Sequence, residues 1–248
     1  MYQFFVEPNQ INTTDNSVII IGSDVNHIKN VLRMKVGEEL AVSNGVDGKE
    51  YRCAVVALEE DCIRCELRFV KEDGVELSSK VYLFQGLPKA DKMELIIQKA
   101  VELGVYQVIP VAAKRCVVKL DDKKAKSKIA RWQGIAEAAA KQSKRGIIPK
   151  VSEVMTFGEA VQLAKEMDVK LIPYELAEGM EKTKEIIGGL QPEQSIAIFI
   201  GPEGGFEEGE IAKALEHGIE PITLGKRILR TETAGFTVLS WIMYQLED

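Results

Sequence analysis

Residues 196–234 read IAIFIGPEGGFEEGEIAKALEHGIEPITLGKRILRTETA, and two strand-to-loop transitions within them point to the class of fold. The apolar run Ile196–Ile200 ends at Gly201, and the shorter run Pro221–Leu224 ends at Gly225. Loops that follow buried strands bind small molecules in open α/β sheets, because their glycines let the backbone come close to a ligand. Two such loops, about twenty residues apart, predict one shared pocket.

Strand and helix patterns alternate from residue 80 to the C-terminal end of the chain. Thr156 and Glu159 have the spacing of a capping box, and Thr231 or Thr233 is expected to cap the last helix. Strands that alternate with helices predict a mostly parallel, doubly wound sheet. The expected strands are 81–85, 105–111, 169–173, 196–200 and 221–224, and the expected helices are 91–103, 126–145, 156–167, 182–187, 207–217 and 233–246.

The first seventy or so residues have a different pattern, in which short strands follow one another between turn signals. Several short strands at such spacing predict a small barrel. One short helix, capped by Asp24, is expected to interrupt them. The polar run Lys71–Glu76 contains a glycine and is the expected linker, so that residues 1–72 and 73–248 form two domains. The expected strands of the barrel are 2–6, 18–21, 39–42, 50–58 and 62–70.

The chain has 248 residues, 46% of them hydrophobic and 28% charged, as in ordinary globular proteins. It has no long apolar run and no signal-peptide pattern, so we expect a cytoplasmic protein without a membrane partner. Cys62 and Cys65 have the spacing of metal ligands, but no second pair and no nearby histidine completes a site. We therefore expect no metal, and thiols in a strand of a cytosolic protein.

Positive charge is concentrated between Lys114 and Lys150, where twelve lysines and arginines and three acids give +9 in a chain of net charge −6. Such a basic region in an acidic protein is either a surface that contacts phosphates or a solvated helix face. Charge alone leaves both interpretations open. Trp132 within this region and Trp241 lie on apolar stripes, which places them in the core or at a dimer interface.

The loop Gly201–Gly205 lacks the motifs of nucleotide-phosphate sites. No Gly-Lys-Ser/Thr follows it, and it is not a Gly-x-Gly-x-x-Gly fingerprint. Glu203 would repel a pyrophosphate but suits a cationic ligand or can accept a proton. A tight strand-to-helix turn without a ligand is the alternative.

The second loop, residues 224–234, combines apolar and charged residues. Leu224, Ile228 and Leu229 are able to form the walls of an apolar slot for a flat ring, with Arg230 and Glu232 supplying charge at its mouth. The two loops together therefore predict a pocket for a ligand with a flat ring and a positive charge.

Ile200–Phe206 and Leu224–Ala234 resemble the two signature loops of the SPOUT (α/β-knot) RNA methyltransferases, and the chain is most similar to the RsmE family. That family methylates N3 of a uridine in small-subunit (16S) ribosomal RNA. Where the family has Glu-Gln, this chain has Lys141-Gln142. Further segments that resemble the family are His27–Arg33 with Gly37, Lys92–Glu94, Gln98–Ala100, Glu102–Val105, Glu137-Ala138, Gln142-Ser143 with Arg145, and Ile148-Pro149.

The resemblance implies a PUA-like N-terminal barrel and a C-terminal domain whose last segment threads a trefoil knot. It also implies S-adenosylmethionine as cofactor, a homodimer, and ribosomal RNA or the small ribosomal subunit as partner. The implied cofactor-binding residues are Tyr174, with Glu175 beside it, Ile200, Gly201, Gly204, Gly205, Leu224, Gly225, Ile228 and Leu229. Candidate RNA contacts are Arg33, Arg115, Lys141, Gln142 and Arg145.

Methyl transfer to uridine N3 needs loss of the N3 proton and stabilisation of the resulting anion. A guanidinium beside a uracil carbonyl favours that anion without losing a proton itself. Arg230 is the first candidate for this role. Glu203 and Glu232 are candidate bases, and the alternative is that they only orient an arginine. The target base must be unstacked to expose N3.

Two other functions remain open from the sequence. A SPOUT methyltransferase can act on another RNA or another atom, and a knot domain that has lost catalysis can persist as an RNA-binding protein. The intact segments Gly201–Gly205 and Arg230–Ala234 argue against the second of these. A nicotinamide or nucleotide enzyme lacks its fingerprint here.

Overall fold

The computed structural model describes residues 1–72, 74–174 and 179–247. The chain divides into two compact units: the first consists of Met1–Glu76 and Ala140–Ile148, and the second of Leu77–Ala139 and Pro149–Asp248. The first boundary lies four residues from the expected end of the barrel domain at residue 72. The return of residues 140–148 to the first unit has no counterpart in the expected division.

The first unit is a curled, open six-stranded sheet with the strand order β1-β4-β5-β6-β3-β2. β1 pairs with β4 in parallel and all other neighbours are antiparallel. Irregularities in the pairing of β5 with β6 occur at two places, where bulges bend a sheet. The strands are β1 (Gln3–Phe5), β2 (Ile11–Asn12), β3 (Ser17–Ile21), β4 (Glu39–Ser43), β5 (Glu50–Leu58) and β6 (Cys62–Lys71), with a short 3-10 helix η1 (Pro8–Gln10) after β1.

A short helix interrupts the strands of the first unit, as expected, but it begins at a different residue from the one predicted. α1 (Ser23–Asn26) is followed directly by a π-helical turn, η2 (His27–Val31). The N-cap is Gly22, so the prediction that Asp24 caps this helix is wrong; Asp24 lies in the first turn instead. There its carboxylate is still favourable, because a negative charge complements the helix dipole.

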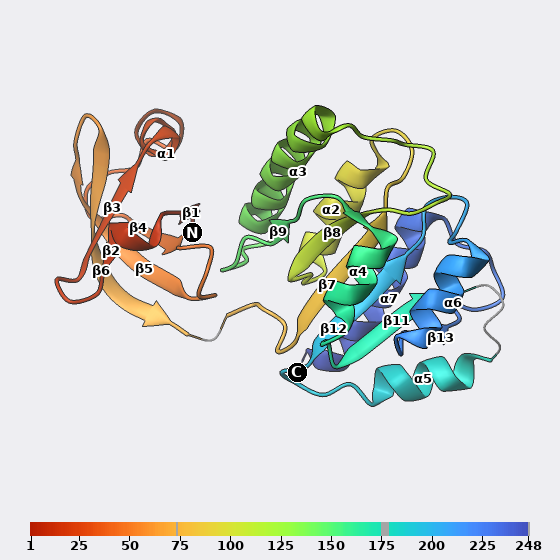
Figure 1. Cartoon of the computed structure of the whole chain (residues 1–248). Helices are drawn as coiled ribbons and strands as arrows, with labels where there is room; N and C mark the ends of the chain where they lie inside the picture. The colour runs from red at the N-terminus through yellow and green to blue at the C-terminus, as the bar shows by residue number, and fades with distance from the viewer. Residues whose placement is uncertain (73, 175–178, 248) are drawn as a thin grey trace. The chain divides into compact units, whose positions relative to one another are not determined.

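The second unit contains a sheet with the order β10-β8-β7-β12-β11-β13, in which every pairing is parallel and β9 also pairs with β8. Helices cover both of its faces; in Figure 1, α4 lies in front of the sheet and α7 behind it. The strands are β7 (Lys80–Gly86), β8 (Gln107–Ala112), β9 (Lys150–Val151), β10 (Met155–Thr156), β11 (Val169–Pro173), β12 (Ser195–Ile200) and β13 (Glu220–Ile222). The mostly parallel sheet is confirmed.

The central strands β7 and β12 form the core of this sheet. Phe84 and Phe199 are fully buried and stack with their ring centroids 4.4 Å apart. Strands that are covered on both faces are apolar along their whole length, which is why Ile196–Ile200 was visible as a continuous apolar run. The helices are α2 (Lys92–Glu102), α3 (Asp122–Gln142), α4 (Phe157–Ala164), α5 (Met180–Gly188), α6 (Glu208–Glu216) and α7 (Thr231–Leu246).

The helix ends show which local signals were reliable. The capping box of Thr156 and Glu159 is present, as expected. α3 starts four residues before the expected position 126 and ends three before 145, and the left-handed residue after it is Lys144 rather than glycine. The prediction that Thr231 or Thr233 caps α7 is wrong, because Arg230 is the N-cap and makes no side-chain capping bond. In the described part of the chain, no helix combines the length and the apolarity that crossing a membrane requires.

Candidate functional site

The first glycine loop turns tightly at the end of β12, next to the end of β7. Gly205 has a φ of +67° and donates its N–H to the Pro202 carbonyl at 2.9 Å. A Cβ on Gly86, the last residue of β7, would lie 2.6 Å from Pro202 Cδ, and one on Gly201 would lie 3.0 Å from Gly205 Cα. These glycines are therefore needed for the loop to close on itself and on β7.

The start of α7 lies against this loop. Thr231 Oγ1 donates to the Gly201 carbonyl at 2.6 Å and accepts a hydrogen bond from Gln85 Nε2 at 2.9 Å. Both side chains are buried, so the threonine hydroxyl joins β7, the first loop and α7 in one network. After β13 the chain thus returns to the ends of β7 and β12, which is the path that the predicted knot requires.

The second glycine loop begins beside β11 and α5. Thr183 Oγ1 accepts the Thr223 N–H at 3.1 Å and donates to the Thr223 carbonyl at 3.2 Å. Gly225 follows with a φ of +100°, and the Tyr174 N–H at the end of β11 donates to the Ile222 carbonyl at 3.0 Å. Tyr174 therefore lies beside this loop, whereas Glu175 lies outside the described residues.

The apolar residues of the second loop are unusually accessible. Leu224 and Leu229 are half-buried, and Ile228 is 89% exposed. The side chain of Ile228 buries little apolar surface on folding, so it is available to contact a ligand or a partner. Ile200, by contrast, is buried at the end of β12, directly before the first loop.

Two predicted acids share one ammonium group at the edge of this region. Lys92 Nζ, in the first turn of α2, lies 3.1 Å from Glu203 Oε1 and 3.5 Å from Glu232 Oε2. The Lys89 N–H also donates to the Glu203 carboxylate, at 3.1 Å. Lys92 is the residue that the sequence did not single out for this site, although it lies within one of the segments that resemble the family.

The two acids differ in their hydrogen-bond partners. Burial acts to raise the pKa of Glu203, but hydrogen bonds from backbone N–H groups and the Lys92 ammonium outweigh it and hold that pKa below its usual value. Glu232 Oε2 is buried and, within ion-pair distance of Lys92, makes no hydrogen bond to the described residues. Both carboxylates thus share the Lys92 ammonium, and Glu203 in addition accepts the Lys89 N–H.

The cationic candidates of the second unit are Arg230 and Arg115. Arg230, within the second-loop segment 224–234, is the exposed N-cap of α7. Arg115 is also exposed, and its Nη1 donates to the Gly204 carbonyl at 3.0 Å. A Cβ on Gly204 would lie 3.4 Å from Arg115 Cβ, so the arginine packs directly on the loop.

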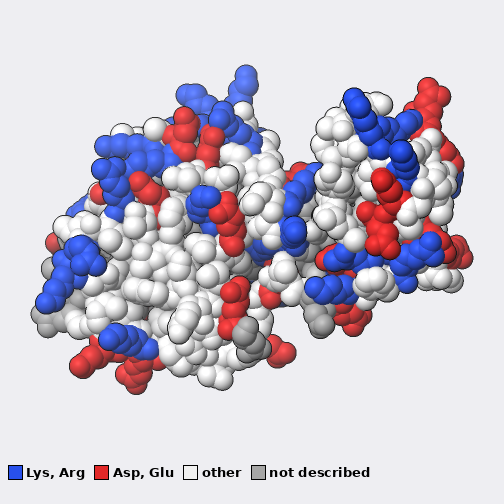
Figure 2. Space-filling view, turned by 180° about the vertical axis from the view of Figure 1, so that it is seen from behind, with Lys and Arg blue, Asp and Glu red and all other residues white. Residues whose placement is uncertain are grey.

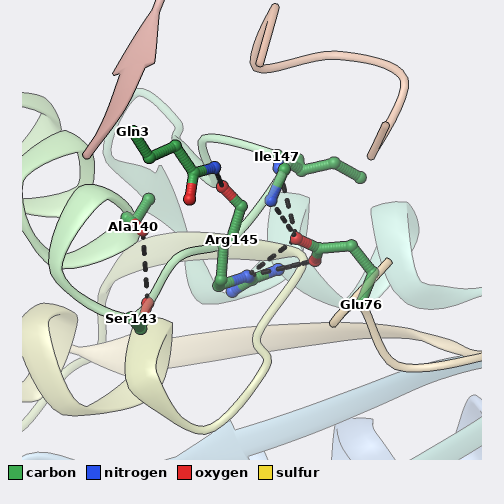
Figure 3. Close-up of polar contacts among 7 residues, drawn as sticks. Gln3, Glu76, Ala140, Ser143, Arg145 and Ile147 are labelled. Carbon is green, nitrogen blue, oxygen red and sulfur yellow. Dashed lines mark hydrogen bonds and ion pairs between the residues drawn. The ribbon is translucent and has the colours of Figure 1, made fainter. Parts of the chain in front are cut away.

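The other candidate RNA contacts belong to the first unit. Arg33 is exposed and has a φ of +54°, Lys141 is half-buried, and Gln142 is exposed at the end of α3. Arg145 is only 4% exposed, and Figure 3 shows its guanidinium directed at Glu76. A direct contact of any of these residues with RNA stays a prediction.

Glu76 fixes residues 145–147 to the first unit. Its carboxylate accepts hydrogen bonds from Arg145 Nε at 3.0 Å, from the Gly146 N–H at 3.0 Å and from the Ile147 N–H at 3.2 Å. The space there is so small that a Cβ on Gly146 would lie 2.4 Å from the Gly48 carbonyl oxygen. Arg145 is therefore part of the packing of the first unit, which sequence charge alone did not reveal.

The described residues contain no group of three or more side chains that could hold a metal ion. The four cysteines are free thiols. Burial raises the pKa of Cys53 and of Cys65 to about 12, so both stay protonated at neutral pH and are poor metal ligands.

Comparison with known proteins identifies the family. Residues 75–243 match the family described as RNA methyltransferase domain, and residues 20–67 match the RNA methyltransferase PUA domain. A relative from Bacillus subtilis, named ribosomal RNA small subunit methyltransferase E, is 39% identical over all of this chain and 98% of its own length. A protein of the same name from Mesomycoplasma hyopneumoniae is 35% identical, over 97% of this chain and 98% of its own.

Solved structures agree with these matches. A ribosomal RNA small subunit methyltransferase E from Neisseria gonorrhoeae, bound to S-adenosyl methionine, is 31% identical with a TM-score of 0.82, and the match covers 98% of this chain and 97% of that one. A putative methyltransferase from Legionella pneumophila, in complex with the same cofactor, is also 31% identical, with a TM-score of 0.78 over 98% and 95% of the two chains. The predicted fold class is thus confirmed, and the chain belongs to the family of RNA methyltransferases whose members are named ribosomal RNA small subunit methyltransferase E.

Proposed function

We propose that this protein transfers a methyl group from S-adenosylmethionine to N3 of a uridine in small-subunit ribosomal RNA. Its relatives are named for methylation of that RNA, and two similar structures carry the cofactor. The observation that carries the proposal is the Thr231–Gly201 hydrogen bond, which holds the start of α7 against the first glycine loop, with Glu203 and Glu232 beside it. The choice of a uridine and of its N3 atom rests on the resemblance of the two loops to the family.

The residues of the two loops fit this cofactor. A Cβ on Gly225 or on Gly205 would meet no atom within 4 Å, so the main chain of both loops faces open space that a ligand can fill. Leu224, Ile228 and Leu229 offer apolar surface for an adenine ring. The nearby carboxylates suit a cationic sulfonium and disfavour a pyrophosphate. We therefore propose that Tyr174, Ile200, Gly201, Gly204, Gly205, Leu224, Gly225, Ile228 and Leu229 hold S-adenosylmethionine.

When bound, the cofactor supplies an electrophilic methyl group. The protein must remove the N3 proton of the uridine and stabilise the anion that remains. We propose that Arg230, an exposed residue of the second-loop segment at the N-cap of α7, stabilises this anion. We propose that Glu232 accepts the proton, because among the described residues its buried Oε2 faces only the Lys92 ammonium at 3.5 Å, whereas the Glu203 carboxylate also accepts a backbone N–H.

We propose that the RNA backbone contacts the lysines and arginines of residues 114–150 and Arg33. Lys124 and Lys126 are exposed in the first turns of α3, where phosphates can reach them. Arg115, Lys141 and Gln142 are further proposed contacts. For Arg145 we propose a positioning role instead, because its guanidinium is buried against Glu76.

We also propose that two copies of the chain associate through α7, and that the enzyme acts in the cytoplasm, where ribosomal RNA is accessible. Tyr244 on α7 is 85% exposed, and Figure 2 shows a broad area with few charged side chains over this part of the second unit. An exposed aromatic side chain on an uncharged surface is typical of an interaction site. Light scattering at twice the chain mass of 27.5 kDa is the expected result.

Two measurements on the purified protein test the proposed function. Calorimetry with S-adenosylmethionine is expected to show binding, which a domain that has lost catalysis does not require. Incubation with the radiolabelled cofactor and small ribosomal subunits or their free RNA, from cells that lack the protein, is expected to label that RNA, with the label in 3-methyluridine. Label in another nucleoside would refute the assignment of N3, and binding without transfer would favour an RNA-binding protein.

A further inference from the structure

A cavity of about 250 Å³ lies in the second unit, at the loop between β7 and α2. Its lining shares no residue with the two glycine loops that we assign to the cofactor, but it includes the loop that contacts Glu203. Its lining comes from the β7–α2 loop, the start of α2, the segment that precedes α3, and α3 itself. The residues that matter for its chemistry are Leu87, Ala90, Asp91, Val118, Lys128 and Trp132.

The walls of this cavity are mainly apolar, and its charged groups are a carboxylate and an ammonium. Trp132 is buried and contributes to the wall, while Asp91 and Lys128 lie 3.9 Å apart and are accessible. Enzymes that act on a nucleobase extrude it into a pocket of apolar and aromatic side chains, with polar groups at the edge of the base. Drug-sized ligands occupy about 300–1,000 Å³, so this slightly smaller cavity suits a single base.

The same loop that lines the cavity also contacts the candidate acid Glu203. The Lys89 N–H donates to the Glu203 carboxylate at 3.1 Å, and Lys92 Nζ lies 3.1 Å from Glu203 Oε1. Ala90 between them has a φ of +53°, a left-handed conformation that is uncommon for alanine and that clusters at functional sites. The cavity thus opens on one side of a constrained loop whose backbone contacts the proposed reaction site.

The surroundings of the cavity favour a polyanionic ligand. Lys124, Lys126 and Arg131 accompany Lys128 on α3. Figure 2 shows lysines and arginines gathered over the end of the second unit where α3 begins. A single-stranded nucleic acid is bound by this combination of cations for the backbone and an apolar or aromatic surface for the base.

We propose that this cavity receives the target pyrimidine of the RNA after it leaves its stack, with Lys128 donating to a carbonyl of the base. Asp91 holds the ammonium in place from the other side. The inference rests on the proposed function as an RNA methyltransferase and adds the place where the acceptor base is held.

A pair of adjacent valines provides the test. Val118 lines the cavity, whereas Val117 does not and is 68% exposed. Phenylalanine at position 118 fills the cavity and is expected to lower the rate of methyl transfer to ribosomal RNA by about tenfold to a hundredfold, the range in which loss of a base contact falls. S-adenosylmethionine binding by calorimetry and the melting temperature are expected to stay unchanged. The matched variant Val117→Phe is expected to keep the wild-type rate.

A second measurement does not depend on activity. In a Trp241→Phe background, Trp132 is the remaining tryptophan, and short oligouridine is expected to quench its fluorescence. Val118→Phe is expected to remove this quenching, and Lys128→Met, a surface change, is expected to weaken it. A wild-type rate of methyl transfer by Val118→Phe would overturn the proposal. An absence of quenching by oligouridine in the Trp241→Phe protein would also overturn it. Quenching together with an absence of methyl transfer by the wild-type protein would support the base site and refute the proposed function.

Discussion

Replacement of Glu76 by alanine is expected to destabilise the first unit strongly. The carboxylate accepts hydrogen bonds from the Gly146 and Ile147 N–H groups and from the guanidinium of Arg145, whose side chain is 5% exposed. Removal of one partner from a buried ion pair costs about 3–5 kcal/mol, because the other charge stays buried and unpaired. The Glu76 side chain is 17% exposed, so in the alanine variant water can solvate part of the Arg145 guanidinium. We therefore expect the free energy of unfolding to fall by about 3 kcal/mol, the lower end of this range.

Hydrogen exchange followed by mass spectrometry measures this effect in the first unit alone. A loss of about 3 kcal/mol corresponds to roughly 150-fold faster exchange of the amides of β4 and β5, if they exchange by opening of the whole unit. The matched control is Glu72→Ala, which removes an exposed ion pair with Lys49 and is expected to cost less than about 1 kcal/mol. Equal exchange in the two variants would refute the view that Glu76 anchors residues 145–147.

Three further predictions concern the site in the second unit. Arg230→Ala is expected to lower kcat about a hundredfold with RNA affinity unchanged, since it removes a group that stabilises charge in the transition state; near-full turnover in steady-state assays would refute this role. The pKa of Glu203 is lowered in the folded state, so its contribution to stability is present above its ordinary pKa of 4.5 and is lost as the pH falls through the lower folded value. Lys92→Met is expected to reduce that acid-dependent loss in chemical denaturation at a series of pH values, and an unchanged profile would contradict the ion pair. RNA affinity is expected to fall by about 0.7–0.9 log units per phosphate contact for each log unit of salt, and filter binding that shows no salt dependence would exclude the basic region as a phosphate surface.

Local sequence signals predicted most of the regular elements. β5 and β11 match their expected ranges to the residue, and the capping box of Thr156 was found as expected. These signals lie within a few residues of the elements they specify, so no distant contact changes them. β2, β9 and β10 have only two residues each, too few to show any periodicity, and they were not predicted.

Long-range contacts were beyond what the sequence shows. Thr231 was expected to cap α7, but its hydroxyl is used by Gly201 and Gln85, which are distant in sequence. Arg145 was counted with the basic residues that contact phosphate, since net charge contains no information on burial. Its partner Glu76 lies 69 residues away, and the pairing returns residues 140–148 to the first unit.

The parts of the candidate site that lie within one short segment of sequence were predictable. The two loops, Arg230 and the two acids follow from short segments with an evident chemistry. Lys92 could not be chosen among the 32 lysines and arginines, because its importance comes from its distance to Glu203 and Glu232. The cavity at Trp132 is lined by residues spread over positions 87–132, so no short motif in the sequence indicates it. Only the apolar stripe that contains Trp132 was visible.

Mass mapping of the modified nucleosides in small-subunit ribosomal RNA, from cells with and without this protein, tests the central claim most directly. The proposed function predicts that one 3-methyluridine disappears in its absence, returns with the wild-type chain, and does not return with Arg230→Ala. A nucleoside map that is the same with and without the protein would contradict it.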